Sequence, residues 1–286
     1  MVPKSVDHRV VSRLSCCLGT GKPFGMVNDS NTYPSVNSSR RSFVKASAIA
    51  LSAVATLHVQ AATEAKRKLS GLVSPNDVVL FQGDSITDAG RNREAGTQAN
   101  AQSGLGSGYA WLAAAELLVD HPEAKLKVYN RGNSGNKVHQ LAERWQADCL
   151  ELRPNVLSIL IGVNDFWHMQ NGNYKGTVEI YERDYRALLT ETKKALPKIK
   201  LIICEPFVLR CGAVSDKWFP EFDVYRAAAR RVAKDFKTAF VPFQSIFDQA
   251  VAYAPAAHWA GDGVHPSAAG ASLMAHHWLQ AAVAKR

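Results

Sequence analysis

Five short apolar runs separated by helical patterns constrain the fold of this chain most strongly. One of them, Val156–Ile161 (V-L-S-I-L-I), is apolar along almost its whole length, which is typical of a strand buried on both faces of a parallel sheet. The other predicted strands are Asp77–Phe81, Leu126–Asn130, Lys200–Cys204 and Ala239–Pro242. Strands that alternate with helices predict a single α/β domain, residues 69–286, built on a doubly wound, five-stranded parallel sheet.

The segments between these strands carry apolar residues at helical spacing. Helices are predicted at Gly108–Val119, Lys137–Leu152, Val178–Leu196, Phe222–Phe236, Gln244–Ala252 and Pro266–Ala284. Ser85–Ser107 and the residues that follow Ile161 are predicted to be loops. Because right-handed crossovers bring the C-terminal ends of parallel strands to one edge of the sheet, polar residues after different strands are expected to meet there.

Residues 1–68 differ from the rest of the chain in charge. They hold 10 Lys and Arg against 3 Asp and Glu, whereas residues 69–286 hold 24 against 22. The sequence S-R-R-S-F-V-K at 39–45, followed by the apolar run Ala46–Leu57, is typical of a twin-arginine export signal, and the run is too short to span a bilayer as a helix. We predict a leader that is removed near Ala61, and a periplasmic or extracellular protein without stable membrane anchoring. A basic anchor or a buried helix is the alternative, and Met26 is a second candidate start.

The composition of the domain excludes several function classes. Its nearly balanced charge does not favour nucleic acid as a partner. Cys149, Cys204 and Cys211 lie on apolar segments and are predicted to be buried free thiols, with a Cys204–Cys211 bridge as the alternative. Cysteine and histidine do not occur at metal-ligand spacing, so neither a metal nor another cofactor is predicted.

Four short motifs follow predicted strands or precede the last helix. They are G-D-S-I at Gly83–Ile86, N-R-G-N-S-G-N at Asn130–Asn136, I-G-V-N-D at Ile161–Asp165 and D-G-V-H-P at Asp262–Pro266. Each motif alone has an ordinary explanation, such as a turn serine or a capping residue. Their shared position at one edge of the sheet predicts an active site.

The residue types in these motifs are those of nucleophilic catalysis. The hydroxyl of Ser85 is a poor nucleophile at neutral pH and needs a base. His265 can supply it, because Pro266 is expected to open the final helix and to leave His265 on the loop before it. Asp262, three residues earlier, can accept from one ring nitrogen and leave the other free as the base.

An acyl-transfer site also needs donors for the developing oxyanion. The predicted donors are the backbone N–H groups of Ser85 and Gly135 and the side-chain amide of Asn164. Turn geometry explains Gly135 equally well, and loop capping explains Asn164. The chain lacks the G-x-S-x-G of the α/β-hydrolase elbow.

Together the motifs resemble the four blocks of the SGNH (GDSL-type) hydrolase family, through Gly83-Asp84-Ser85, Gly135, Gly162-x-Asn164-Asp165 and Asp262-x-x-His265. Longer stretches, such as G-D-S-I-T-D-A-G-R and E-R-W-Q-A-D, are similar to the branch of bacterial acetylxylan esterases and carbohydrate deacetylases. The resemblance extends from about residue 76 to 284. It implies a flavodoxin-like three-layer α/β/α sandwich, metal-free acyl hydrolysis and the residue roles given above. In those relatives a Trp directly precedes the Asp, whereas here two residues separate Trp259 from Asp262.

Aromatic and amide side chains in the predicted loops suit sugar rings as substrates. Asp84, Trp167 and Trp259 are the predicted substrate-binding residues, and Trp218 fits a loop or the core equally well. We expect a serine esterase that removes O-acetyl groups from xylan-type glycans. A broad short-chain esterase or lysophospholipase is the first alternative, and a non-catalytic glycan-binding module on the same fold is the second. The sequence leaves homo-oligomer formation open.

Overall fold

The structure is a computed structural model that describes residue 69 and residues 71–283. The predicted leader lies outside the described residues. All described residues belong to one compact unit of the chain, Ala62–Arg286.

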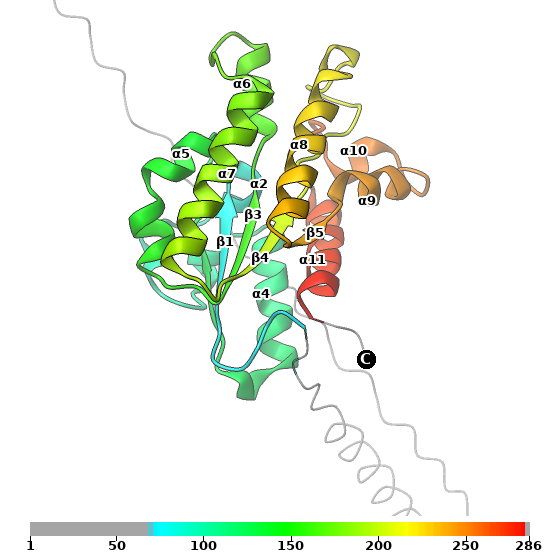
Figure 1. Ribbon diagram of the computed structural model, residues 1–286. Helices are drawn as coiled ribbons and strands as arrows, with labels where there is room; N and C mark the ends of the chain where they lie inside the picture. Colours follow the sequence, from blue (N-terminus) through cyan, green and yellow to red (C-terminus); the bar gives the residue numbers. More distant parts are fainter. Residues whose placement is uncertain (1–68, 70, 284–286) are drawn as a thin grey trace, which may run out of the picture. The chain divides into compact units, whose positions relative to one another are not determined.

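A five-stranded, all-parallel sheet forms the centre of the domain (Figure 1). Its strands are β1 (Val78–Gly83), β2 (Lys127–Asn130), β3 (Val156–Leu160), β4 (Lys200–Cys204) and β5 (Ala239–Val241). Every residue of β3 is buried, as its apolar run predicts for a central strand. The predicted parallel sheet is therefore confirmed, with strand ends displaced by at most two residues.

The strand order β2-β1-β3-β4-β5 contains a topological switch point. The chain passes from β1 to β2 on one side and then returns to β3 on the other, so the loops after β1 and β3 diverge. Ligands bind at such a crevice outside the carboxyl ends of the strands in open α/β sheets. The loops that follow β1 and β3 carry the first and third sequence motifs, so the fold brings these motifs together.

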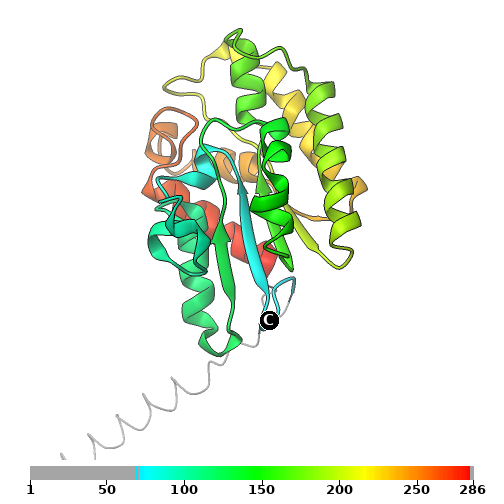
Figure 2. The same ribbon diagram turned by 90° about the vertical axis from the view of Figure 1, so that its left-hand side faces the viewer.

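Helices cover both faces of the sheet, which confirms the three-layer sandwich (Figures 1 and 2). On one face α4 (Tyr109–Asp120) packs against α11 (Ala268–Ala282). On the other face α7 (Val178–Ala195) packs against α8 (Glu221–Asp235) and α5 (Val138–Glu143). Two further helices, α9 (Phe243–Ala250) and α10 (Ala256–Trp259), lie between β5 and the last motif.

Two buried tryptophans of the core have hydrogen-bond partners for their indole N–H groups. The indole Nε1 of Trp278 on α11 donates to Ser158 Oγ on β3 at 2.9 Å, and that of Trp145 donates to Thr192 Oγ1 on α7 at 2.9 Å. Buried donors that lack such partners destabilise a core by about 1–3 kcal/mol each. Each tryptophan therefore anchors its side of the sandwich without an unpaired N–H.

The three cysteines of the domain are free. Cys149 and Cys204 are buried, and Cys211 is half-buried. Cys204 Sγ lies 3.6 Å from Ser158 Oγ, and Cys211 Sγ lies 3.1 Å from the carbonyl oxygen of Ala260. The prediction of free thiols is confirmed, except that Cys211 is only partly buried.

Three predicted segments differ in the structure. Ser85–Ser107 is not one loop but contains three short helical turns, α2 (Ser85–Asp88), η1 (Ala95–Thr97) and α3 (Gln102–Leu105). The residues after Ile161 form α6 (Val163–Gln170) instead of a loop. Asp84 caps α2 by accepting from Ile86 N, and this cap turns the end of β1 directly into a helix.

The predicted helix Lys137–Leu152 is interrupted. It consists of α5 and a π-helical turn, η3 (Gln146–Leu150), because Arg144 leaves the helical conformation at φ −112° and ψ 7°. The final helix begins later than predicted. Ser267 caps it by accepting from Gly270 N at 3.2 Å, so Pro266 precedes the cap instead of opening the helix.

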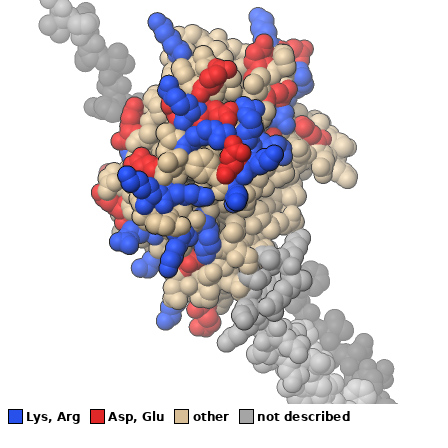
Figure 3. Space-filling model, in the orientation of Figure 1, with Lys and Arg blue, Asp and Glu red and all other residues tan. Residues whose placement is uncertain are grey.

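The face that carries α7 and α8 is covered by both signs of charge (Figure 3). Arg186 pairs with Glu182 and Asp235 at 2.7 Å each, and Arg231 pairs with the same Glu182 at 2.5 Å. Arg186 and Arg231 on this face therefore have acidic partners. Within the described residues, the helices are all too short or too polar to cross a membrane.

Candidate active site

Ser85, His265 and Asp262 form a continuous hydrogen-bonded chain at the carboxyl edge of the sheet. Ser85 Oγ lies 2.7 Å from His265 Nε2, and His265 Nδ1 lies 2.6 Å from Asp262 Oδ2. A carboxylate can only accept, so it selects the imidazole tautomer with the proton on Nδ1 and leaves Nε2 to accept from the serine. The structure thus joins three side chains that span 180 positions of sequence.

Close packing explains the first glycine of the serine motif. A Cβ atom at Gly83 would lie 2.3 Å from the carbonyl oxygen of Leu160 and 2.4 Å from Thr87 Oγ1. These contacts are far shorter than van der Waals distances, so only glycine lets β1 approach β3 and α2 this closely. Ser85 follows as the first residue of α2, where its backbone N–H has no acceptor among the described residues.

The histidine motif is a tight turn fastened to a neighbouring loop. The carbonyl oxygen of Gly263 accepts from Leu209 N at 2.7 Å, and the carbonyl oxygen of Asp262 accepts from Ala213 N at 2.9 Å. Gly263 has a φ of +84°, which L side chains rarely adopt. The turn therefore fixes His265 relative to Ser85 through backbone contacts, although the His265 side chain is 44% exposed.

Hydrogen bonds keep Asp262 ionised. Burial on its own raises the pKa of this carboxyl, but the ring and backbone N–H of His265 and the N–H of Val264 lower it below its usual value. The two backbone donors lie 2.7 and 2.9 Å from Oδ1. The carboxylate is therefore held in place by its own turn and presents Oδ2 to the imidazole.

The predicted oxyanion donors lie after the strands next to Ser85. Asn164 is in the first turn of α6, is 5% exposed, and donates one Nδ2 proton to Asn136 O at 3.3 Å, which leaves its second amide proton for a ligand. Gly135 has a φ of +80° and open space where a Cβ would lie. Its N–H donates to no acceptor of the described residues.

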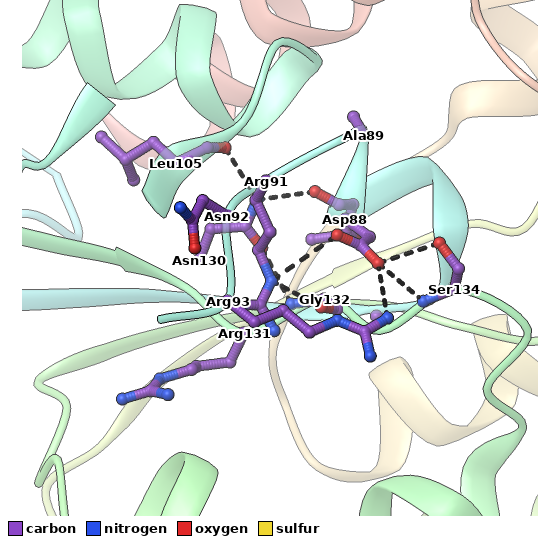
Figure 4. Close-up of polar contacts among 12 residues, drawn as sticks. Asp88, Ala89, Arg91, Asn92, Arg93, Leu105, Asn130, Arg131, Gly132 and Ser134 are labelled. Carbon is purple, nitrogen blue, oxygen red and sulfur yellow. Dashed lines mark hydrogen bonds and ion pairs between the residues drawn. The ribbon is translucent and has the colours of Figure 1, made fainter. Parts of the chain in front are cut away.

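The loop that carries Gly135 is fastened to the serine helix by Asp88 (Figure 4). Asp88 Oδ2 accepts from the N–H and the hydroxyl of Ser134, both at 2.9 Å, and from Arg93 at 3.2 Å. Burial on its own raises the pKa of Asp88, but the Ser134 hydrogen bonds and the charges of Arg93 and Arg91 lower it below its usual value. An ionised carboxylate therefore joins α2 to the residue before Gly135.

Arg144 makes a second connection, between the loop that carries Gly135 and the end of β1. Its guanidinium donates to Asn136 Oδ1 and to the carbonyl oxygen of Arg131, both at 2.8 Å, and to the carbonyl oxygen of Gly83 at 3.4 Å. Asp148 balances its charge at 2.8 Å. Asp88 and Arg144 were missed as site residues by sequence reasoning. Their sequence signal is that they lie in G-D-S-I-T-D-A-G-R and E-R-W-Q-A-D, two stretches that resemble the family.

Two buried carboxyl groups lie below the catalytic edge. Asp84 and Asp165 are each 1% exposed, and each uses one oxygen to accept a backbone N–H, from Ile86 and Val138 respectively. Their Oδ2 atoms are buried without a hydrogen-bond partner among the described residues. Burial raises the pKa of each to about 7, and the charge of Asp84 further raises that of Asp165. Asp84, predicted to bind substrate, is thus a buried capping residue.

The tryptophans predicted for substrate binding lie on different helices. Trp167 is half-buried on α6 and packs on Trp218 with ring centroids 5.4 Å apart. Trp259 is half-buried at the end of α10 and donates to Ala254 O at 3.2 Å. Trp218 is 2% exposed and packs against Phe166 and Phe222, so it is a core residue.

Comparison with known proteins decides the family. Residues 81–273 match the GDSL-like Lipase/Acylhydrolase family, and this match includes Ser85, Asn164 and both residues of the Asp262–His265 turn. The chain belongs to the GDSL-like lipase/acylhydrolase family. It is therefore a carboxylic ester hydrolase with the fold of the SGNH hydrolases.

The matches between this acylhydrolase and its individual relatives extend over nearly the whole length of those relatives. An acetylxylan esterase of Geobacillus stearothermophilus is 33% identical over 213 residues, which are 73% of this chain and 94% of the relative. A structure from Parabacteroides merdae, described as a GDSL-like lipase, is 52% identical with a TM-score of 0.72, covering 74% of this chain and 99% of its own. The Geobacillus acetyl-xylooligosaccharide esterase Axe2 is 32% identical with a TM-score of 0.68, covering 75% and 100%.

Solved structures of Axe2 include three described as catalytic mutants, in which a serine, an aspartate or a histidine is replaced by alanine. The same three residue types form the hydrogen-bonded chain of this acylhydrolase. In the described part of the chain, groups of three or more metal-ligating side chains do not occur. The chemistry that the site's own side chains offer is proton transfer and nucleophilic attack by a hydroxyl.

Proposed function

We propose that this acylhydrolase removes O-acetyl groups from carbohydrate, of the xylan type or a related one, through Ser85, His265 and Asp262. The observation that carries the proposal is the chain of 2.7 and 2.6 Å contacts from Ser85 through His265 to Asp262. The identity to an acetylxylan esterase over most of both chains supports acetyl as the acyl group and a glycan as the alcohol.

The first half-reaction forms an acyl-enzyme. Ser85 Oγ attacks the ester carbonyl carbon while His265 Nε2 takes the hydroxyl proton, and the carbonyl oxygen becomes an oxyanion. The N–H groups of Ser85 and Gly135 and the free amide proton of Asn164 would stabilise it, and a single such donor is typically worth about 10²–10³ in rate. The bond from the carbonyl carbon to the sugar oxygen then breaks, and His265 returns the proton to that oxygen.

The second half-reaction releases acetate. A water molecule takes the place of the sugar, His265 removes one of its protons, and the resulting hydroxide attacks the acetyl-serine carbonyl. The bond to Ser85 Oγ breaks, and the proton returns to Oγ from His265. Asp262 remains ionised throughout and stabilises the imidazolium that exists in both halves.

Acetate release from acetylated xylo-oligosaccharides tests the proposal. The wild-type protein should release acetate, and Ser85→Ala should not, while a fluorophosphonate probe should label the wild type only. An acyl-chain series on aryl esters separates an acetylesterase from a lysophospholipase. A preference for long acyl chains, or an enzyme active on aryl acetate but inert on acetylated glycans, would contradict a carbohydrate substrate. Glycan binding without labelling would indicate a binding module.

We further propose that the protein is exported by its twin-arginine-type sequence, which lies outside the described residues. The motif at 39–45, the apolar run that follows it and the charge difference between residues 1–68 and 69–286 support this. Replacing Arg40 and Arg41 by lysine should retain the esterase in the cytoplasmic fraction. If the double variant is exported normally, the signal has been misassigned.

A further inference from the structure

Lys137 is a buried cation without an acidic partner in contact. Its side chain belongs to a residue that is 8% exposed, and Nζ lies 3.2 Å from His168 Nδ1 and 5.4 Å from the centroid of the Tyr174 ring. Among the described residues, none places a carboxylate oxygen within 4.0 Å of Nζ. A charge removed from water is costly unless it is paired. An anionic ligand would compensate the charge of such a lysine.

Lys137 lies close in sequence to Gly135, one of the proposed oxyanion donors. It follows Gly135 by two residues. Its neighbours Asn136 and Val138 are bound to the first turn of α6, through Asn164 Nδ2 at 3.3 Å and Asp165 Oδ1 at 3.2 Å. His168 lies one turn beyond Asn164 on the same helix, a rise of about 5–6 Å. Lys137 Nζ thus lies at the level of His168, farther from the sheet than the group that would receive the acetyl carbonyl.

The hydrogen bond between Lys137 and His168 determines which of their N–H groups remain available to a ligand. An ammonium has donors only, so His168 Nδ1 accepts and the neutral imidazole carries its proton on Nε2. Burial, and then the charge of Lys137, lower the pKa of His168, which keeps the ring neutral at pH 7. Lys137 keeps two further N–H donors, and His168 keeps one.

Two other features surround this pair. Tyr174 is stacked on His139 with ring centroids 5.2 Å apart and planes 20° apart, which provides a flat surface beside the ammonium. Asp165 also interacts electrostatically with Lys137, and burial raises the pKa of this carboxyl to about 7.

We propose that Lys137 and His168 form a subsite for a sugar that carries a carboxylate, that is, a uronic acid unit next to the acetylated sugar. The ammonium and the His168 Nε2–H bind the carboxylate, and the stack of Tyr174 on His139 keeps the Tyr174 ring beside the ammonium. The proposal rests on the carbohydrate esterase function proposed above and names its substrate class more closely. Hydrogen bonds that involve a charged group are the stronger ones, worth about 10- to 100-fold in binding.

The decisive experiment compares acetylated xylo-oligosaccharides with and without a glucuronosyl branch. In the wild type, kcat/KM for the acidic substrate should exceed that for the neutral one by about tenfold or more, and Lys137→Met should remove most of this preference. Lys137→Arg, which keeps the charge, should retain much of it. The matched control is Lys193→Met. Lys193 has a similar cation–π contact, 5.5 Å from the Phe236 ring, but lies at the far end of α7, and its loss should leave the preference unchanged.

Competition experiments keep the proposal testable if glycans prove not to be substrates or if Lys137→Met does not fold. Methyl glucuronoside should inhibit the hydrolysis of an aryl acetate by the wild type more strongly than methyl glucoside, and added salt should weaken this difference. Equal inhibition by both sugars, or an acidic preference that Lys137→Met leaves intact, would overturn the subsite. Failure to release acetate from either glycan, with selective inhibition by the glucuronoside retained, would overturn the deacetylase function alone.

Discussion

At the scale of single residues, the proposed reactivity of Ser85 depends on the transfer of its hydroxyl proton to His265. The hydroxyl proton points along a 2.7 Å contact to His265, and the positive charge that results on the ring lies 2.6 Å from an ionised Asp262. Neither histidine nor aspartate is well buried, since each side chain is more than 40% exposed. Their geometry therefore depends on hydrogen bonds within the turn, and the effect of each bond can be measured separately.

Replacing Asp262 by asparagine should lower kcat on an aryl acetate by roughly 10³–10⁴. The amide oxygen can still accept from the N–H groups of Val264 and His265, so the turn and the melting temperature should change little. The amide cannot stabilise the imidazolium and can force the wrong tautomer of His265. Measuring kcat and the melting temperature together separates these effects. A variant that retains kcat within tenfold would remove Asp262 from the proposed triad.

The buried carboxyls Asp84 and Asp165 predict a pH dependence of stability. Both have a folded-state pKa of about 7, raised by burial from an unfolded value near 4. Their stabilising contribution is therefore fully present below pH 4 and is lost as the pH rises through about 7. Asp165→Asn should reduce the loss of stability between pH 5 and pH 8, by an amount on the order of 2 kcal/mol.

Urea unfolding of the wild type and of Asp165→Asn at both pH values is the measurement, with Asp235→Asn on the surface as the control. The control should follow the wild-type pH dependence. If the free energy of unfolding changes equally with pH in the wild type and in Asp165→Asn, this carboxyl does not titrate between pH 5 and pH 8.

At the scale of elements, the site is an assembly of segments joined by a few charged side chains. Strand β1 and the loop 131–137 belong to different parts of the sequence, and Arg144, at the end of α5, donates to oxygens of Gly83 in β1 and of Arg131 and Asn136 in the loop. The same residue ends α5 early and so explains why the predicted long helix is interrupted. Arg144 thus both ends α5 and holds the loop 131–137 against the end of β1.

Arg144→Gln should therefore reduce kcat by about 10- to 100-fold while changing KM little, because the Gly135 N–H would lose its fixed position relative to Ser85. Arg144→Lys can retain one hydrogen bond and the pair with Asp148, but not the planar set of donors. Its kcat should therefore lie between those of the wild type and Arg144→Gln. Weaker binding of a boronic-acid transition-state analogue, with an unchanged melting temperature, would identify positioning as the cause. A rise in KM alone would contradict it.

The elements show what sequence patterns can predict. All five strands were located to within two residues because continuous apolar runs have few other uses in a soluble α/β domain. Helix α6 is not predicted because V-N-D-F-W-H-M-Q carries buried polar residues, Asn164 and Asp165, in its first turn, and these obscure the apolar spacing of a helix. The motif residues Ser85, Asp262 and His265 could be predicted from their spacing. The roles of Asp88, Arg144 and Lys137 could not be predicted, because their partners lie in segments distant in sequence; the stretches G-D-S-I-T-D-A-G-R and E-R-W-Q-A-D contain Asp88 and Arg144 but do not show what these side chains bind.

At the scale of the whole molecule, the domain is closed at the sheet edge opposite the site. Gly71 forms an antiparallel bridge with Val283, and the N–H groups of Leu72 and Val73 both donate to Ala282 O. Val73 is 1% exposed and packs into the core. The first described residues thus belong to the folded domain and connect its beginning to its last helix.

A chain that starts at residue 69 should fold and hydrolyse aryl acetate, whereas one that starts at residue 76 should melt roughly 7–20 °C lower. The longer deletion removes the buried Val73 side chain, worth about 1.5–3 kcal/mol, and two backbone hydrogen bonds, each worth about 1 kcal/mol. Calorimetry of the two truncated proteins measures the difference. Equal melting temperatures would mean that the bridge contributes nothing to stability.

Because both ends of the domain meet at the Gly71–Val283 bridge, the enzyme has a natural point of attachment. A bead, a surface or a carbohydrate-binding partner joined at either terminus would hold the molecule by the edge farthest from Ser85 and leave the catalytic edge facing the medium (Figure 1). The same proximity would allow the two ends to be joined by a short linker and the chain to be opened elsewhere, so that circular permutants with new termini in an exposed loop become practical.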